Sequence, residues 1–322
     1  MPARHAPLVL IALLAACATA PPARTDLSWD AVPGQSIALR RATATGTEVV
    51  WQFHFGDAHH KPCFHPLALP GDRVLTLDMP GDHRWHNGLW FSWKYIDKVN
   101  YWENDRQTGR PVGRTTWQLT DYALRDDGTA QLVLELDYAP PDGEAVLAER
   151  RVLDVSAPAA DGTFAIDWHG EFLCRRACTL DRTPLPGEPG GAANGGYAGL
   201  GARLALLDGR EANTTLGPVA WNAQNRFRDR APAFDYSGVL DGQEVGLAIL
   251  AHPDTVRSPS PWYAIRAPQM SFFMPAVICY GPMALQPGDR FTVRYRVITH
   301  PGRWTGPELA AAVAAYVDSS TP

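Results

Sequence analysis

Residues 81–105, GDHRWHNGLWFSWKYIDKVNYWEND, combine two histidines, four tryptophans and several carboxylates in one short span. Imidazole titrates near neutral pH, so His83 and His86 are candidate proton donors and acceptors. Pro80-Gly81 and Asn87-Gly88 flank them, which predicts a loop at the end of a sheet. On an extended strand the two rings would lie on opposite faces, roughly 10 Å apart, whereas a turn would bring them together.

Three more residues complete the candidate catalytic set. His65 stands beside a proline, Glu103 comes at a predicted strand end, and His252 ends an apolar strand. With His83 and His86 they could serve as an acid and base pair. His65, His83 and His86, together with the Glu103 carboxylate, equally form a ligand set for a divalent ion such as zinc, manganese or iron. Whether a metal binds is left open.

A candidate cleft wall follows the histidines. Period-two alternation from Leu89 to Tyr95 places Trp90 and Lys94 on one face, and the apolar residues between them on the other. Aromatic walls with interspersed polar groups suit a sugar ring, which stacks its apolar face and hydrogen bonds through its hydroxyls. The alternative is structural: the tryptophans fill a core, and the histidines bond to loop carbonyl groups.

Two charged residues of the later chain have similar alternatives. The planar guanidinium of Arg257 could bind a carboxylate or a pair of hydroxyls, or it could bond to loop carbonyls. Asp235 could belong to the substrate site, or it could cap the hairpin that precedes Gly238.

The elements that must position these residues are mostly strands. Period-two alternation and turn signals predict a hairpin after Asp126-Asp127-Gly128 and another around Asp241-Gly242. Thr305 and Glu308 fit a capping box and begin the clearest helical pattern. The strand segments include 129–138, 234–236, 245–251 and 291–297. Many short strands without interleaved helices predict an all-β fold, a large antiparallel β-sandwich with a C-terminal helix.

This sandwich is predicted as one domain over residues 27–322, with a mobile glycine-rich loop at 184–196. Arg4 and His5 precede an apolar run that ends in Leu14-Ala15-Ala16-Cys17, which resembles a bacterial lipobox. We therefore expect a signal peptide at 1–16, lipidation of Cys17 and a tether at 17–26. The expected location is the outer membrane of a Gram-negative bacterium, facing the periplasm or the cell surface.

The amino-acid composition limits the classes of binding partner that are expected. The net charge is −5 and no Lys/Arg cluster occurs, so nucleic acid is not an expected partner. The expected partners are a small carbohydrate and a membrane contacted through lipid only. No Gly-x-Ser-x-Gly, P-loop, His-Glu-x-x-His or Cys-x-x-Cys motif occurs. Pairing of Cys63, Cys174, Cys178 and Cys279 is left open; Cys174 and Cys178 could pair only across a turn.

Five motifs resemble the PmoA-like family, catalogued as "methane oxygenase PmoA", over about residues 38–300. They are His65-Pro66-Leu67, the stretch from Asp82-His83 to Phe91, Gly196 to Leu200, Asp235 to Gly238, and His252-Pro253 through Arg257 to Pro261-Trp262-Tyr263. The resemblance implies that Tyr197, Asp235, Arg257 and Trp262 bind substrate. It also implies carbohydrate catabolism, because members are often encoded beside sugar oxidoreductases. The architecture is similar to the galactose mutarotase-like supersandwich, whose members use His and Glu as acid and base.

Three hypotheses about function follow. The first is an enzyme of isomerase, epimerase or lyase type, acting on a sugar or oxidised sugar by acid and base chemistry. The second is a non-catalytic, sugar-binding lipoprotein. The third is a redox metalloprotein, as the family label implies.

Overall fold

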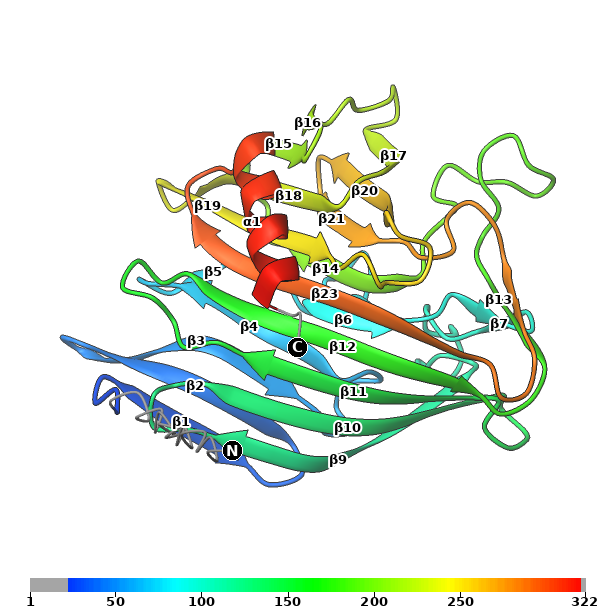
Figure 1. The fold of residues 1–322 in the computed structure, drawn as a ribbon, viewed down its shortest axis with the longest axis horizontal. Helices are drawn as coiled ribbons and strands as arrows, with labels where there is room; N and C mark the ends of the chain where they lie inside the picture. The colour runs from blue at the N-terminus through cyan, green and yellow to red at the C-terminus, as the bar shows by residue number, and fades with distance from the viewer. Residues whose placement is uncertain (1–22, 320–322) are drawn as a thin grey trace, which may run out of the picture.

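The computed structural model describes residues 23–319, which form two large antiparallel sheets, a small third sheet and one C-terminal helix (Figure 1). The predicted signal peptide and the lipidation site Cys17 lie outside the described residues. The ten-stranded sheet runs in the order β1 (Leu27–Val32), β2 (Ser36–Thr43), β3 (Gly46–His54), β4 (Cys63–Leu69), β6 (Leu89–Ser92), β14 (Gly199–Leu204), β21 (Met270–Pro275), β20 (Pro261–Ala267) and β17 (Arg226–Arg230), and β5 (Arg73–Val74) pairs with β4.

The second large sheet has nine strands. Its order is β16 (Gly217–Pro218), β15 (Asp208–Thr214), β18 (Ala233–Leu240), β19 (Gln243–Ala251), β23 (Arg290–Pro301), β12 (Phe164–Cys174), β11 (Leu147–Val155), β10 (Ala130–Ala139) and β9 (Arg114–Leu124). The small sheet contains β22 (Met283–Leu285), β13 (Cys178–Asp181), β7 (Tyr95–Ile96) and β8 (Val99–Asn100). The predicted all-β fold with antiparallel sheets and one C-terminal helix is confirmed.

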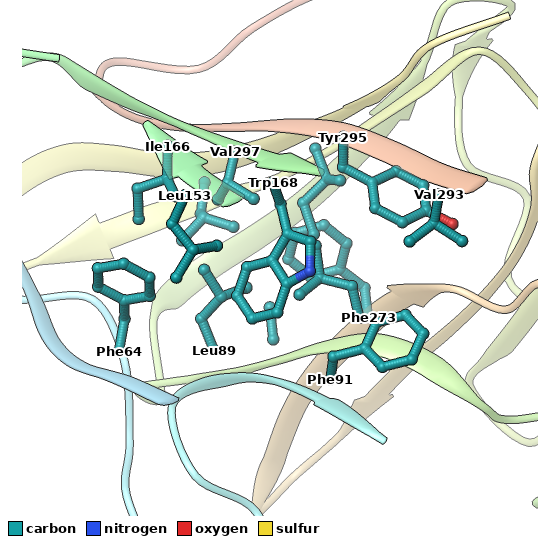
Figure 2. Close-up of a cluster of buried hydrophobic side chains, with 14 of the residues drawn as sticks. Phe64, Leu89, Phe91, Leu153, Ile166, Trp168, Phe273, Val293, Tyr295 and Val297 are labelled. Carbon is teal, nitrogen blue, oxygen red and sulfur yellow. The ribbon is translucent and has the colours of Figure 1, made fainter. Parts of the chain in front are cut away.

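The main core fills the space between the two large sheets. Trp168 of β12 lies near its centre, with Phe64 and Phe91 from the ten-stranded sheet below it and Tyr295 from the nine-stranded sheet beside it (Figure 2). Alternate residues of each strand point to the same face, so one apolar set per strand is enough to build this core.

The middle strands of the ten-stranded sheet, including β6, β14 and β21, are buried on the outer face as well. Neighbours of the core residues point away from the core: Cys63 beside Phe64, and Trp90 beside Phe91. Together with residues from β14, β20 and β21 they form a second apolar cluster. Strands buried on both faces read as nearly continuous apolar runs, which explains the density of aromatic residues between Leu89 and Trp93.

Both predicted hairpins and the helix are present. Asp126 to Gly128 connect β9 to β10, and Asp241 and Gly242, with φ of 49° and 75°, connect β18 to β19. At the start of α1 (Gly306–Ser319), the backbone N–H of Thr305 donates to Glu308 Oε2 at 2.7 Å.

Helix α1 packs on the outer face of the nine-stranded sheet, where Leu309 and Tyr316 contact residues of β18 and β19 (Figure 1). Within residues 23–319, no helix combines the length and apolarity needed to cross a bilayer.

Candidate functional site

A solvent-connected pocket lies on the outer face of the ten-stranded sheet, over the second apolar cluster. It encloses about 380 Å³ of space outside the protein atoms, part of it open solvent. Its lining comes from distant parts of the chain: His83, Trp85, His86, Trp102, Glu103, Asn194, Tyr197, Tyr263, Ile265, Met270 and Phe272. Four of the predicted site residues therefore meet here: His83, His86, Glu103 and Tyr197.

Two consecutive turns bring the histidines together. The N–H of His83 donates to Pro80 O at 3.0 Å, and the N–H of His86 donates to His83 O at 2.9 Å. Met79 N–H closes the loop by donating to His86 O at 2.8 Å. The two imidazole centroids lie 4.7 Å apart. The predicted loop is confirmed, and it places both rings at one point.

His83 is oriented by a charged pair. Its Nδ1 lies 3.0 Å from Asp82 Oδ2, and Arg203 NH2 donates to both oxygens of Asp82 at 3.0 and 3.1 Å. Burial acts to raise the pKa of Asp82, but the hydrogen bonds and charges of Arg203 and His83 outweigh it and hold that pKa below 3.8. In a neutral His83, an ionised carboxylate beside Nδ1 favours the tautomer that carries its proton on Nδ1, and the lone pair is then on Nε2.

His86 lies deeper and is 5% exposed. Its ring stacks on Phe272 with centroids 5.0 Å apart, and its Nδ1 is buried without a hydrogen-bond partner among residues 23–319. Burial, aided by electrostatic effects of the neighbouring His83 and Arg203, places the pKa of His86 well below 6.5. His86 is therefore a neutral imidazole at neutral pH.

Glu103 brings a negative charge into the pocket. Its carboxylate accepts hydrogen bonds from Lys94, from the Tyr197 hydroxyl and from Asn100 Nδ2, the last at 2.7 Å. Burial acts to raise the pKa of Glu103, but the charge and hydrogen bond of Lys94, with the other two donors, bring it below 4.5. Asn100 Oδ1 also accepts the backbone N–H groups of Trp102 and Glu103, which fixes the turn that presents the carboxylate.

Two predicted wall residues occupy different places. Trp90 is fully buried with its ring 4.9 Å from that of His86, and Lys94 is buried as an ion-pair partner of Glu103. The alternation predicted their shared face correctly, but loops cover that face. The indoles that line the pocket are those of Trp85, which is half-buried, and Trp102, which is 1% exposed.

His65 does not join the pocket, which corrects its predicted convergence with His83 and His86. Its Nδ1 lies 2.9 Å from Thr76 Oγ1, and the charges that act on it belong to Asp78, His54 and His59. The predicted metal ligands His65, His83 and His86 therefore do not come together within the described residues.

His252 and Asp235 also lie elsewhere and do not line the pocket. The His252 ring packs against Tyr316 of α1, with centroids 5.5 Å apart. Asp235 is fully buried between Ser237 Oγ and His300 Nε2, each 2.8 Å from its carboxylate. Asp235 lies in β18 and His252 directly follows β19, both in the nine-stranded sheet, whereas the pocket lies on the ten-stranded sheet.

Arg257 and Trp262 have structural contacts. Arg257 donates to Gly281 O and Pro282 O, both at 2.6 Å, as its structural alternative anticipated. Trp262 is buried in the main core, and its Nε1 donates to Ala231 O at 2.8 Å. Arg257 and Trp262 are close together in the sequence motif, but the structure does not bring them together in the pocket.

Three residues that shape the site had only a weak signal in the sequence. Asp82 and Arg203 orient His83, and a lone arginine in the otherwise apolar run 202–207 was the available signal. Lys61 is 1% exposed and donates to Trp102 O at 2.8 Å. Burial, opposed by the charge of Glu103, lowers the pKa of Lys61 to about 7.

The fold and the pocket define a large antiparallel sandwich with a site on one outer face. The chain belongs to a family of unknown function, DUF6807, whose model matches residues 41–314. The more specific PmoA-like assignment stays a prediction. No curated protein matches the sequence.

Solved structures with low similarity include sugar-related enzymes. A putative aldose 1-epimerase from Klebsiella pneumoniae is 9% identical, with 88% of this chain and 83% of that chain covered and a TM-score of 0.42. A galactose mutarotase related enzyme from Lactobacillus acidophilus is 7% identical, with 85% and 97% covered and a TM-score of 0.40. An α-galactosidase from Lactobacillus brevis is 11% identical, with a TM-score of 0.37; 86% of this chain aligns with 40% of the galactosidase.

Proposed function

We propose that this protein is an enzyme that transfers protons on a sugar or an oxidised sugar bound in the pocket. One observation carries the proposal: an imidazole oriented by a carboxylate, His83, stands beside a neutral imidazole, His86, in an aromatic pocket that also holds an ionised carboxylate. Acid and base chemistry at neutral pH needs groups of this kind in contact with one ligand.

The pocket suits a sugar ring. The half-buried Trp85 offers an indole surface against which the apolar face of a pyranose can stack, and the buried Trp102 contributes to the apolar lining. Glu103 and Asn194 are polar groups in the same lining and can bind hydroxyls. The carbohydrate therefore has both kinds of contact that it needs.

In the proposed reaction, Nε2 of His83 removes a proton from the carbon next to a carbonyl group. The electron pair of the broken C–H bond forms a C=C bond, and the carbonyl electrons move to the oxygen, which gives an enediolate. Neutral His86 can donate an N–H hydrogen bond to that oxygen. Return of the proton to the neighbouring carbon, with transfer of the hydroxyl proton from one oxygen of the enediolate to the other, gives an isomer. Return to the opposite face of the original carbon gives an epimer, and loss of a β-substituent with its electron pair completes an elimination.

Non-catalytic sugar binding is the second candidate, and one observation favours it. Glu103 already accepts hydrogen bonds from Lys94, Tyr197 and Asn100, and its pKa is below 4.5, so it is a weak proton acceptor. A carboxylate of this kind is well suited to holding hydroxyls.

Exchange of carbon-bound protons with solvent distinguishes the two functions. The protein in D₂O is incubated with aldoses, ketoses and uronic acids, and deuterium incorporation is followed by NMR, which detects proton removal whatever the final product. For the substrate found, His83→Ala should lower the exchange rate by about 100-fold or more. His169→Ala, on the outer face of β12, is the matched control and should not change it.

Isothermal titration calorimetry with the same sugars measures binding, and its results can contradict the proposal. Sugar binding without exchange in any member would favour the non-catalytic candidate. Absence of both binding and exchange would overturn the proposal of a carbohydrate site.

A further inference from the structure

A second group of ionisable side chains lies at the base of the loop that carries His83 and His86. His59, Cys63 and Asp78 each offer one ligand atom, and these atoms all lie within 4.8 Å of one another. His59 Nε2 and Asp78 Oδ2 are already 2.9 Å apart. The pocket does not include any of the three.

The fold brings this group together from three segments. Cys63 is the first residue of β4, His59 lies in the turn before that strand, and Asp78 immediately precedes the loop. His59 and Cys63 are buried, and the Asp78 side chain is 15% exposed. The three side chains are therefore shielded from solvent, and the strand and the loop determine their positions.

The donor types define the ligand. An imidazole nitrogen, a thiolate sulfur and a carboxylate oxygen form a mixed set that hard ions such as magnesium and calcium do not favour. In a tetrahedral zinc site, bond lengths of about 2.0–2.3 Å place ligand atoms roughly 3.3–3.8 Å apart. Ligand atoms as far apart as 4.8 Å would have to approach each other by about 1.0–1.5 Å to reach that geometry, whereas the His59 and Asp78 atoms, 2.9 Å apart, would have to separate slightly.

We propose that His59, Cys63 and Asp78 bind a divalent first-row transition ion of the zinc class, with water in the fourth position. Binding replaces the His59–Asp78 hydrogen bond and releases the thiol proton of Cys63.

Neighbouring residues orient the ligand groups and provide a route from solvent to the site. Asn87 Nδ2 donates to Asp78 Oδ1 at 3.3 Å, so the carboxylate is oriented from its second oxygen. The ring of His54 lies 4.6 Å from that of His59. His59 also lines a separate surface cavity with His60 and Arg110, which gives an ion a route from solvent.

The bound ion would join β4 to the loop. Asp78 and Asn87 form a backbone bridge at the two ends of the loop, and Cys63 pairs with Trp90 of β6. A metal held by Asp78 and Cys63 would therefore fix the base from which His83 and His86 project, whatever reaction the pocket performs.

Cobalt titration tests the site without any assay of activity. Protein purified without an affinity tag is stripped with a chelator and titrated with Co²⁺. We expect one equivalent to bind with a thiolate-to-cobalt charge-transfer absorption in the near ultraviolet, and Zn²⁺ to displace it. The band should be lost in Cys63→Ser and retained in Cys279→Ser, which replaces another buried cysteine.

Thermal unfolding of the wild-type protein tests the site even if a variant fails to fold. Zinc at 100 times its Kd should raise the Tm of the stripped wild-type protein by about 5 °C. Lack of one-equivalent cobalt binding by the wild-type protein, or an unchanged band in folded Cys63→Ser, would overturn the proposal.

Discussion

At the scale of single residues, the pocket depends on histidines whose surroundings differ sharply. His83 is oriented by an ionised carboxylate near the surface, whereas His86 is enclosed by rings and has a pKa well below 6.5. The same residue type therefore offers a base at one position and a neutral hydrogen-bonding group at the other.

The buried imidazole has a consequence for stability. The unfolded chain takes up a proton on residue 86 as the pH falls through about 6.5, while the folded protein resists until its lower pKa is reached. Stability should therefore fall as the pH is lowered below about 6.5. In His86→Leu, the Tm should fall less between about pH 7 and pH 5 than in the wild-type protein.

The residual acid sensitivity of that variant should come from other histidines, because burial also lowers the pKa values of His54 and His65. Differential scanning calorimetry across this pH range measures the difference. Equal slopes for the two proteins would contradict the assignment of a depressed pKa to His86.

At the scale of elements, the loop is positioned by a glycine at its end. Gly88 has φ of 64°, and a Cβ added there would stand 2.3 Å from Phe64 O on β4. Gly109 has a similar φ of 69° with nothing near the added Cβ. The two glycines separate the effect of backbone conformation from the effect of close packing.

We expect Gly88→Ala to destabilise the fold by more than Gly109→Ala, whose cost should be about 1–2 kcal/mol from backbone strain alone. Gly88→Ala adds a collision with β4 that only a shift of the loop can relieve. Chemical denaturation of both variants gives the comparison. Equal losses of stability would show that the loop moves freely on the sheet.

The predictability of the site also differs between elements. Pro80-Gly81 and Asn87-Gly88 indicated the loop, and alternation indicated which face Trp90 occupies. Neither pattern specifies what covers that face, because burial of an outer face depends on loops that return from elsewhere in the chain. The sequence patterns therefore did not predict that Arg203 and Tyr263 belong to the site. They predicted that His252 would emerge at the edge of a sheet, but α1 covers that edge.

At the scale of the whole molecule, a buried ion pair lies between the sheets. Arg151 of β11 donates to Glu149 at 2.6 and 2.9 Å, and both side chains are inaccessible. The guanidinium lies 4.6 Å from the ring centre of Trp168 and 5.8 Å from that of Phe91 on the opposite sheet. This group therefore connects the two layers through their common core.

Removing one partner should leave an uncompensated buried charge. We expect Arg151→Met to lower the free energy of unfolding by about 3–5 kcal/mol. Arg150→Met, which removes an exposed partner of Glu135, should change it by less than about 0.5 kcal/mol. Urea denaturation measures both. A second change, Glu149→Gln, should recover part of the stability of Arg151→Met, and failure to do so would locate the loss in packing.

The two-faced sheet separates architecture from specificity. In β20 and β21, Ala264 and Phe273 serve the core, while Ile265 and Phe272 line the pocket. Mutations among the outward residues can alter ligand preference with little effect on the packing that joins the sheets. Such a division lets descendants of one ancestral gene diversify their chemistry on an unchanged frame, and it makes libraries restricted to those positions a sound starting point for directed evolution.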